Sequence, residues 1–283
     1  MKVLLLGAAG QLGTDVVGTW TDDEVIAIKH EDCDVRDRER VSATVNAHEP
    51  EVVIDNAAYV RVDDAEQEPL EAFAVNAEGA KNVADASVEA GAAVVYVSTD
   101  YVFGEGVESH REDDLVTPQG AYAISKAAGE ALIRETTPRH FIVRSSGLYG
   151  SAGSSGKGGN FVETMLAFAR EGRSWKVVAD QVLSPTYTRD LALKLREVLA
   201  TGEHGTYHLT NRGHCSWFEF ALATLRLAGF QADLRPTTSA EWNAPAPRPE
   251  YSVLAETKLA KLGVKPIRPW QEALQAYLDE RTS

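Results

Sequence analysis

The sequence predicts an α/β fold, with a doubly wound parallel sheet and a smaller C-terminal substrate-binding portion. Three observations support this fold class: short apolar runs alternate with amphipathic segments, the first run leads into a glycine-rich turn, and the pattern changes after residue 144. Strands buried on both faces appear as continuous apolar runs, and helices between them cover the two faces. Ligands should therefore bind at the carboxyl ends of the strands.

Five apolar runs are the predicted strands of this sheet, over residues 3–6, 25–28, 52–54, 94–97 and 141–143. Between them, apolar residues recur at helical spacing and predict helices over residues 11–19, 36–48, 69–90 and 122–135. This alternation is typical of the right-handed crossovers that join parallel strands.

Composition and charge exclude several classes of function. The chain has 283 residues, a net charge of −14, and no apolar run near the roughly eighteen residues that a membrane span needs. Its first residues fit a buried strand rather than a signal peptide. Because an acidic surface disfavours nucleic acid and anionic membranes as partners, we expect small-molecule partners.

Two further features of the composition concern the environment of the protein. Cys33 and Cys215 have no metal-ligand spacing and predict buried thiols in a cytoplasmic protein. The 28 basic residues are 10 lysines and 18 arginines. This acidic, lysine-poor composition fits either a halophilic protein or an ordinary acidic enzyme.

The glycine-rich turn Gly7-Ala-Ala-Gly10-Gln-Leu-Gly13 directly follows the first predicted strand and opens the first predicted helix. Small residues let the backbone approach a pyrophosphate, and the start of a helix offers unpaired N–H donors. The turn therefore predicts a dinucleotide site, with Gly7, Gly10, Gln11, Leu12 and Gly13 as candidate cofactor-binding residues.

The residues after the second strand bear on the choice of cofactor. Lys29 follows this strand, where an NAD site usually has a carboxylate, and a basic residue there can meet a 2′-phosphate. We therefore favour NADPH, although the nearby Glu31 and Asp32 keep NADH possible. Asp34 and Val35 could contact the adenine, but Asp34 fits equally well as a turn residue before the next helix.

The third strand runs into a further group of candidate cofactor-binding residues, Asn56, Ala57, Ala58 and Tyr59. The two small alanines leave room for the ribose and the phosphates, and the Asn56 side chain can hold the loop by hydrogen bonds. With a cofactor site at these strand ends, we expect residues 1–150 to form the dinucleotide-binding domain. Residues 151–283 would be mainly substrate-binding, with about 188–210 returning to the main sheet.

This second portion has a different pattern. Residues 145–159 are rich in Gly and Ser, and residues 160–170 and 191–199 fit helices. Residues 206–210 fit a strand, and residues 236–249 are expected to be a proline-containing loop.

Tyr122 and Lys126 are four residues apart, so a helix would put both on one face, within reach of Thr99 at the end of the fourth strand. A positive charge beside a phenol favours the phenolate, so we expect Lys126 to lower the pKa of Tyr122 from about 10. Tyr122 would then act as the proton donor for carbonyl reduction. The same spacing also occurs in ordinary surface pairs, and the neighbouring motifs decide between the two interpretations.

The glycine turn, Asn56-Ala57-Ala58, Ser98-Thr99 and the Tyr122–Lys126 pair occur in this order, and the chain resembles the extended short-chain dehydrogenase/reductases, which have a Rossmann-like sheet. Within this superfamily it resembles the dTDP-4-dehydrorhamnose reductase family over essentially its whole length. The segments that carry the resemblance are residues 10–13, 62–66, 98–103, 160–161, 180–181, 184–186, 205–208, 248–249 and 252–254.

The resemblance implies NADPH-dependent reduction of the C4 keto group of the nucleotide sugar dTDP-4-dehydro-L-rhamnose to dTDP-L-rhamnose. Tyr122 would be the catalytic acid, Lys126 would bond the nicotinamide ribose, and Thr99 would hydrogen-bond the carbonyl oxygen. The candidate substrate-binding residues are Thr99, Asp100, Tyr122, Asn160 and Arg248.

The sequence departs from the family pattern in two places. Gly147 stands where the family often has a tryptophan near the sugar, which leaves the identity of the sugar open. Some members dimerise through magnesium; Asp15 fits one ligand, but Arg189 stands at the place of another, so we predict no metal. The resemblance allows a homodimer, although no residue indicates one.

Several charged residues have two possible roles. Asp63, Asp64 and Glu66 are expected at a solvated helix start, where acidic side chains are favourable. Arg144 and Arg248 fit either the substrate diphosphate or a structural salt bridge.

Two other functions compete with the reductase. A nucleotide-sugar epimerase or dehydratase would keep NAD bound and return the hydride within one cycle. A non-catalytic cofactor-binding subunit, similar to the regulatory partner of methionine adenosyltransferase, would not need Thr99, Tyr122 and Lys126 together.

Overall fold

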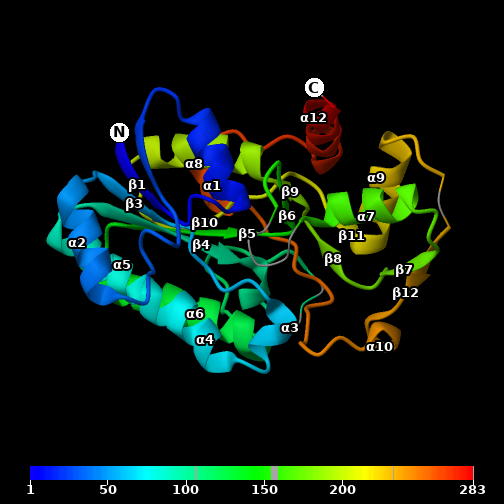
Figure 1. Ribbon diagram of the computed structural model, residues 1–283, viewed down its shortest axis with the longest axis horizontal. Coiled ribbons are helices and arrows are strands. Elements are labelled where there is room, and N and C mark those ends of the chain that lie inside the picture. The colour runs from blue at the N-terminus through cyan, green and yellow to red at the C-terminus, as the bar shows by residue number, and fades with distance from the viewer. Residues whose placement is uncertain (105, 107, 154–158, 232, 283) are drawn as a thin grey trace.

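The computed structural model describes residues 1–104, 106, 108–153, 159–231 and 233–282. It shows a parallel sheet with helices on both faces and, beside it, a smaller group of short strands and helices (Figure 1). The Gly- and Ser-rich segment over residues 145–159 is only partly described, because residues 154–158 lie outside these ranges.

The central sheet has the strand order β10-β5-β4-β3-β1-β2, and all neighbouring strands are parallel. The strands are β1 (Lys2–Leu6), β2 (Glu24–Ile28), β3 (Val52–Asp55), β4 (Ala93–Thr99), β5 (His140–Ser145) and β10 (Gly205–His208). From β1 the chain passes to β2 on one side and then to β3 on the other, which makes a topological switch point at the ends of β1 and β3. The predicted α/β fold class is confirmed.

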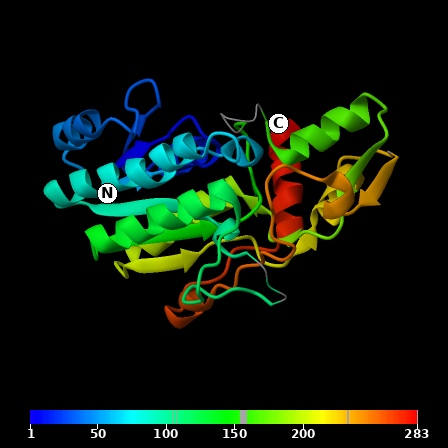
Figure 2. The same cartoon turned by 90° about the horizontal axis from the view of Figure 1, so that it is seen from below.

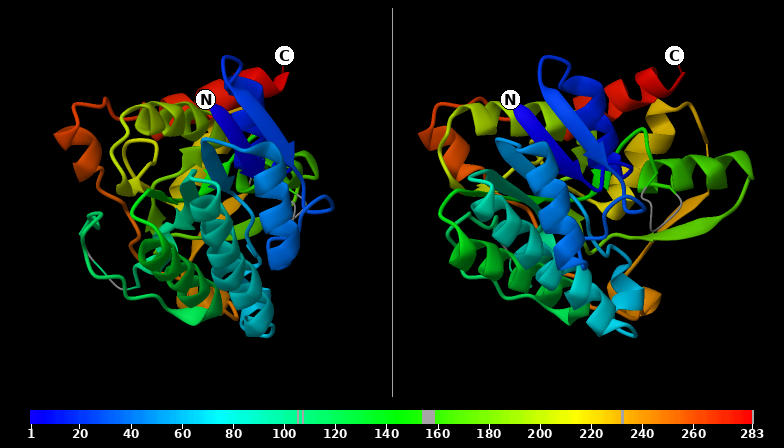
Figure 3. Two further views of the ribbon diagram at one scale, coloured as in Figure 1. Left: turned by 90° about the vertical axis from the view of Figure 1, so that its left-hand side faces the viewer. Right: turned by 60° about the vertical axis from the view of Figure 1, so that its left-hand side comes forward.

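Helices cover both faces of this sheet (Figures 2 and 3). On one face lie α1 (Gln11–Thr19) and α8 (Thr188–Ala200); on the other lie α2 (Arg38–His48), α5 (Ala80–Glu89) and α6 (Gly120–Thr136). Because side chains alternate along a strand, Val3 and Leu5 pack against the first layer and Leu4 and Leu6 against the second. The buried Trp20 ties the first layer together, since its indole N–H donates to the Ala192 carbonyl over 2.9 Å.

The helix predicted over residues 69–90 is divided into three parts. It consists of α4 (Pro69–Phe73), a π-helical turn η1 (Ala74–Gly79) and α5. Within this turn, the amide of Asn76 accepts from the Tyr59 N–H over 2.8 Å and donates to the Ser125 hydroxyl over 2.9 Å. The π turn thus places the Asn76 side chain between the loop after β3 and helix α6. Such turns are frequent at functional sites.

The smaller group and the connecting segments contain the remaining elements. The strands are β6 (Leu148–Tyr149), β7 (Trp175–Val178), β8 (Val182–Leu183), β9 (Thr186–Tyr187), β11 (Cys215–Ser216) and β12 (Leu234–Thr237). The helices are α3 (Val62–Ala65), η2 (Asp100–Val102), α7 (Phe161–Arg170), α9 (Trp217–Leu227), α10 (Ser239–Trp242), α11 (Thr257–Lys261) and α12 (Trp270–Thr282). Tyr149, Phe220 and Trp270 belong to a core cluster of their own in this group.

Most predicted boundaries shift by one to three residues, and two differences in the second half of the chain change the type of structure or shorten an element. The strand predicted over residues 206–210 ends at His208. The loop predicted over residues 236–249 contains the end of β12 and the short helix α10, because the Thr238 hydroxyl caps the helix start by accepting from the Glu241 N–H. Asn243 then ends α10 in a left-handed conformation, before the prolines.

None of the helices in the described part of the chain combines the length and the apolar character that crossing a membrane requires. Cys33 and Cys215 are both buried free thiols.

Candidate active site

The glycine-rich turn lies between β1 and α1 and depends on two glycines. Gly7 has a φ of +74°, and a Cβ there would lie 2.8 Å from backbone atoms of Asn56 and Ala57. A Cβ on Gly13 would lie 2.7 Å from Ala8, so glycine lets α1 approach β1 closely. Because no side chain caps the start of α1 at Gly10, the first N–H groups of this helix suit an anionic ligand.

A cavity of about 340 Å³, the cofactor cavity, lies at this turn. The predicted cofactor-binding residues that line it are Gly7, Gly10, Gln11, Leu12, Asp34, Val35, Asn56, Ala57, Ala58, Tyr59, Tyr122 and Lys126. Gly13 packs behind the turn. Lining residues that were not predicted are Ala9, His30, Cys33, Val60, Val75, Val97, Ser98 and Leu148. Val97 and Ser98 directly precede Thr99 on its strand, so their place in the sequence could have indicated that they line the cavity. The sequence around Val75 and Leu148 gave no such indication.

The end of β2 differs from the expectation for Lys29. Its amino group lies 3.7 Å from Glu31, and both side chains are exposed, whereas His30 lines the cavity. Lys29 lies at the surface and is not one of the described residues that line the cavity. A contact of Lys29 with a 2′-phosphate stays a prediction.

Asp34 has the predicted turn role before α2 and also lines the cofactor cavity, where a contact with the adenine stays a prediction. Its carboxylate accepts from the Arg36 backbone N–H over 3.0 Å and from the Arg36 guanidinium over 2.6–3.1 Å. These hydrogen bonds hold the pKa of Asp34 below its usual range. Arg36, which also donates to Glu71 over 2.8 Å, was not among the predicted site residues.

The three predicted catalytic residues come together at the boundary of two cavities. Thr99 ends β4, and Tyr122 and Lys126 lie on α6, one turn apart. Thr99 donates to Asp100 over 3.1 Å and lines the substrate cavity together with Tyr122. The Lys126 ammonium donates to the Val97 carbonyl over 2.7 Å and lies 3.9 Å from the centre of the Tyr96 ring.

The prediction that Lys126 lowers the pKa of Tyr122 is wrong for this geometry. Burial raises the pKa of Tyr122 to about 12, and the nearby Thr99 hydroxyl opposes this rise only in part. The reason is the direction of Lys126, whose ammonium is bonded to the Val97 carbonyl rather than to the phenol. At neutral pH Tyr122 is therefore a neutral phenol, which is the form that can donate a proton.

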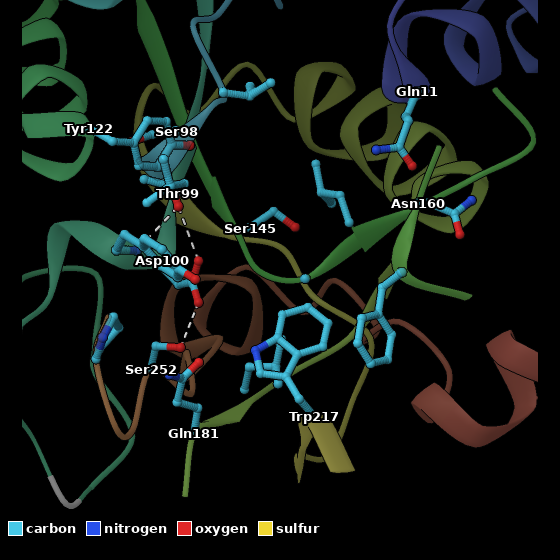
Figure 4. Close-up of a pocket in the computed structure, with 18 of the residues that line it drawn as sticks. Gln11, Ser98, Thr99, Asp100, Tyr122, Ser145, Asn160, Gln181, Trp217 and Ser252 are labelled. Atoms are coloured by element: carbon cyan, nitrogen blue, oxygen red, sulfur yellow. Dashed lines mark hydrogen bonds between the residues drawn. The ribbon is translucent and has the colours of Figure 1, made fainter. Parts of the chain in front are cut away.

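A second cavity of about 440 Å³, the substrate cavity, adjoins the first (Figure 4). Of the predicted substrate-binding residues, Thr99, Asp100, Tyr122 and Asn160 line it. The residues that line both cavities are Gln11, Val60, Ser98, Tyr122 and Leu148. Figure 4 shows Thr99 and Tyr122 on one side and Gln11 and Asn160 across from them. Among the described residues, the buried Gln11 Oε1 has no hydrogen-bond partner, which makes it a further candidate contact.

Asp100 and Asn160 already have several protein partners. Asp100 is buried and accepts from the hydroxyls of Ser146 and Ser252 over 2.7 and 2.6 Å, in addition to Thr99. Burial raises its pKa. Asn160 caps α7 by accepting from the Glu163 N–H over 3.0 Å. Both residues therefore also hold the walls of the substrate cavity together.

The aromatic group missing at Gly147 is supplied from elsewhere in the chain. Gly147 has a φ of +53°, and a Cβ there would lie 2.5 Å from Leu183, so a tryptophan does not fit without a shift. Trp217, at the start of α9, lines the substrate cavity together with Phe161 and Tyr101. The sequence gave no signal for Trp217, because it comes from a segment seventy positions away from Gly147.

Arg248 lies outside the substrate cavity, in an ion pair. Its guanidinium donates to both oxygens of Asp63, over 3.0 and 2.9 Å, and Asp63 also accepts from the Ala246 N–H. Arg248 lines a neighbouring cavity of about 600 Å³. Asp63 and Asp64 both lie in the first turn of α3, as predicted. Asp63, whose side chain is 41% exposed, has the ion pair with Arg248 in addition, and Asp64 lies 3.3 Å from the half-exposed Arg61.

Arg144 takes the structural role rather than the diphosphate-binding one. It is buried, and its Nε and Nη2 donate to the two oxygens of Glu130 over 2.8 and 2.7 Å. Such a two-point contact fixes both side chains, and it leaves Arg144 beneath the cavities instead of inside them.

Glu66 is exposed, as expected, but it lies at the end of α3 rather than at its start and has a further contact. Its Oε1 accepts from the Ala121 N–H over 2.7 Å, one residue before Tyr122, and α6 has no side-chain cap of its own at Gln119. Glu66 therefore acts as a cap for the helix that carries Tyr122 and Lys126.

Replacing Glu66 with alanine is expected to lower the free energy of unfolding by about 1 kcal/mol, the usual cost of a lost helix cap. Amide hydrogen exchange at Ala121 should also become faster. Glu66→Gln keeps an acceptor oxygen and is the matched control, for which both values should stay close to those of the wild type. Equal destabilisation in the two variants, without faster exchange at Ala121, would show that Glu66 does not cap α6.

The residues considered for a metal have other partners. The Thr188 hydroxyl donates to Asp15 over 2.5 Å, and Arg189 pairs with Glu280 at 3.1 Å. Within the described ranges, no group of three or more His, Cys, Asp or Glu side chains is arranged to hold a metal ion.

A doubly wound sheet, a glycine turn at its switch point and a Tyr–Lys pair between two cavities define a dinucleotide-binding protein of the short-chain dehydrogenase/reductase type. A family model described as RmlD substrate binding domain matches residues 1–283. The chain belongs to this family, the dTDP-4-dehydrorhamnose reductase family that its sequence resembles.

Three relatives illustrate the similarity. The spore coat polysaccharide biosynthesis protein SpsK of Bacillus subtilis is 41% identical over 287 residues, which cover 100% of this chain and 98% of the relative. A probable dTDP-4,6-dihydroxy-2-methyloxan-3-one 4-ketoreductase of Streptomyces antibioticus is 38% identical, over 97% and 94% of the two chains. The crystal structure of dTDP-4-dehydrorhamnose reductase from Bacillus anthracis in complex with NADP has a TM-score of 0.95 and 38% identity, over 99% and 100%.

Proposed function

We propose that this chain is an oxidoreductase that uses NADPH to reduce the C4 carbonyl of dTDP-4-dehydro-L-rhamnose to dTDP-L-rhamnose. The observation that carries the proposal is the position of Tyr122, which lines both the cofactor cavity and the substrate cavity. A proton donor at this boundary can reach a carbonyl in one cavity while a hydride arrives from the other. The name of the Bacillus anthracis relative supports the same reaction, and that of the Streptomyces antibioticus relative supports reduction of a 4-keto group on a dTDP-sugar.

The cofactor cavity fits a dinucleotide. Its glycine turn leaves no room for a Cβ at Gly7, and Ala57 and Ala58 keep the opposite wall small. Bound there, NADPH would supply the hydride. The exposed Lys29–Glu31 pair is weak, because both side chains are well hydrated, so a 2′-phosphate could replace Glu31 as the partner of Lys29. The NADP complex of the Bacillus anthracis relative favours NADPH over NADH.

The protein side of the reaction is a proton transfer. As hydride adds to C4, the electrons of the C=O double bond move to the oxygen, and the Tyr122 hydroxyl gives its proton to that oxygen. The Thr99 hydroxyl donates its single proton to Asp100 in the structure, and it would turn this proton to the same oxygen as charge accumulates. Lys126, one turn along α6, lines the cofactor cavity and would bond the nicotinamide ribose.

Residues 151–283 would provide most of the substrate-binding portion. The cavity that contains Arg248 shares Phe161, Gln181 and Trp217 with the substrate cavity. It also contains Trp175, Trp242, Arg173 and Lys176, side chains that suit a base and phosphates. We place the nucleotide of the substrate in this cavity.

The test is to mix the purified protein with dTDP-4-dehydro-L-rhamnose and either NADPH or NADH and to follow cofactor absorbance. Oxidation of NADPH in proportion to product is expected. Turnover by protein that carries bound NAD and needs no added cofactor would favour the epimerase or dehydratase. Dinucleotide binding without turnover of any 4-keto sugar would favour the non-catalytic subunit.

We also propose a cytoplasmic location, because Cys33 and Cys215 remain free thiols, and we leave a homodimer to measurement of the molecular mass.

If the acidic surface reflects a halophilic protein, desalting should lower its Tm, because repulsion within a net charge of −14 is screened by salt. Thermal unfolding at low and at molar KCl measures this. A Tm that stays the same after desalting would mark an ordinary acidic enzyme.

A further inference from the structure

A buried carboxyl group, Asp55, interrupts an apolar row that crosses the sheet. The row runs from Ile28 through Leu6, Asp55 and Tyr96 to Ile142, each directly opposite the next in the parallel register. Side chains at matched positions of parallel strands point to the same face, and this row faces the layer that contains α6. Asp55 is 1% exposed, so its carboxyl is held away from water.

The two oxygens of Asp55 differ in their contacts. Oδ1 accepts from the Ala57 N–H over 3.2 Å. Oδ2 is buried and, among the described residues, has no hydrogen-bond partner. An unpaired buried carboxyl oxygen is costly unless a nearby charge compensates for it. The surroundings of Asp55 should therefore contain a cation.

Lys126 is that cation. Its ammonium lies over the ring of Tyr96, which is the neighbour of Asp55 in the row, and it donates to the Val97 carbonyl. The other acid near Lys126 is Glu130, which already accepts from Arg144, from Arg134 over 2.8 Å and from the Ser98 hydroxyl over 2.6 Å. Since Glu130 is bound to two guanidinium groups, Asp55 is the acid left to balance Lys126.

The electrostatics agree with this geometry. Burial raises the pKa of Asp55, and the charge of Lys126 opposes that rise. Burial lowers the pKa of Lys126, and the charges of Asp55 and Glu130 oppose that fall. The groups that can carry charge around the pair are Tyr96 on β4 and Tyr122 and Glu130 on α6.

We propose that Asp55 is a positioning residue for the reduction, and that its carboxylate keeps Lys126 in the ammonium form beneath the cofactor cavity. Its consequence for catalysis rests on the proposed function, in which Lys126 lines the cofactor cavity and would bond the nicotinamide ribose. The charge relation between Asp55 and Lys126 holds independently of that function.

The direct test is an NMR titration of the free protein with ¹³C-labelled lysine, in which Lys126→Met identifies the Lys126 signal. Removing the negative charge in Asp55→Asn should move the titration midpoint of Lys126 down by about one pH unit, within the range found for neighbouring opposite charges. In the enzyme assay, the alkaline limb of kcat/KM should move down by the same amount. An unchanged Lys126 midpoint in Asp55→Asn overturns the inference.

Glu256→Gln is the matched control, because burial also raises the pKa of Glu256, to about 7, while this residue lines neither cavity. In Glu256→Gln, the titration midpoint of Lys126 and the pH profile should equal those of the wild type. A shift as large as that in Asp55→Asn would contradict a specific role of Asp55.

If Asp55→Asn does not fold, the Asp55 carboxyl carbon can be titrated in the wild type. Asp55 must then lose its proton at a lower pH than Lys126, and the reverse order overturns the inference. Should the wild type reduce no 4-keto sugar, the proposed function fails, while the lysine titration still decides this inference.

Discussion

Replacing Tyr122 with phenylalanine is expected to lower kcat by about 10²–10⁴-fold, the usual contribution of a positioned general acid. The ring and its contact with Tyr101 are kept, so the fold and the cofactor cavity should stay intact. Only the proton that neutralises the developing alkoxide is lost. Because this proton is used after substrate and cofactor bind, the Kd for NADPH should change little.

Tyr149→Phe is the matched control for this variant. Tyr149 is also a buried tyrosine, its hydroxyl has no hydrogen-bond partner among the described residues, and it lines neither cavity. Its kcat should equal that of the wild type. Steady-state kinetics and a fluorescence titration with NADPH measure both variants, and a Tyr122→Phe enzyme with wild-type kcat would remove Tyr122 as the proton donor.

The second large effect is expected from Gly7→Ala, which should raise the Kd for NADPH at least about tenfold. A φ of +74° costs a residue with a Cβ about 1–2 kcal/mol. That Cβ would also lie 2.8 Å from the Ala57 backbone N, where only a movement of the backbone can make room. Since the turn holds the start of α1 against the end of β3, such a movement displaces the N–H groups that would bind the pyrophosphate.

Gly18→Ala tests whether this effect is local. Gly18 lies on the same helix α1, and a Cβ there would meet no atom within 4 Å. The substitution should leave the Kd unchanged and raise the Tm slightly, because alanine stabilises a helix more than glycine does. If Gly7→Ala binds NADPH as tightly as Gly18→Ala, the turn is not the phosphate site.

The fold and the cofactor turn could be predicted because their signals are local. Apolar runs mark the strands of the sheet, and the spacing of Gly7, Gly10 and Gly13 reports a close backbone approach that the structure contains. The family resemblance added the pairing of Thr99 with Tyr122 and Lys126, and the structure brings these residues together at one boundary.

The charge partners could not be predicted, because they depend on long-range packing. Asp63 and Arg248 are 185 positions apart, and a helix start rich in acids gives no sign of such a partner. The pKa of Tyr122 depends on burial and on the direction in which the Lys126 ammonium points, neither of which follows from their four-residue spacing. Asp55 could have been noticed as an acid at the end of an apolar strand, but only the sheet register shows that it lies beside Tyr96.

The substrate cavity was the least predictable part. Trp217 and Gln181 come from the smaller group, whose short strands have weak patterns, and they reach the site only because β8 pairs with β11. Gly147 marks one position at which this chain has no aromatic side chain. It could not indicate that Trp217 contributes one from α9.

The most direct measurement of the central claim is a single turnover with NADPH deuterated at C4 of the nicotinamide, tested as each of the two stereoisomers. The product of dTDP-4-dehydro-L-rhamnose is then analysed by mass spectrometry and NMR. We expect one stereoisomer to place one deuterium at C4 of the 6-deoxy sugar, with one NADP⁺ formed per product. Product without deuterium from either stereoisomer, or no consumption of NADPH, would contradict the account.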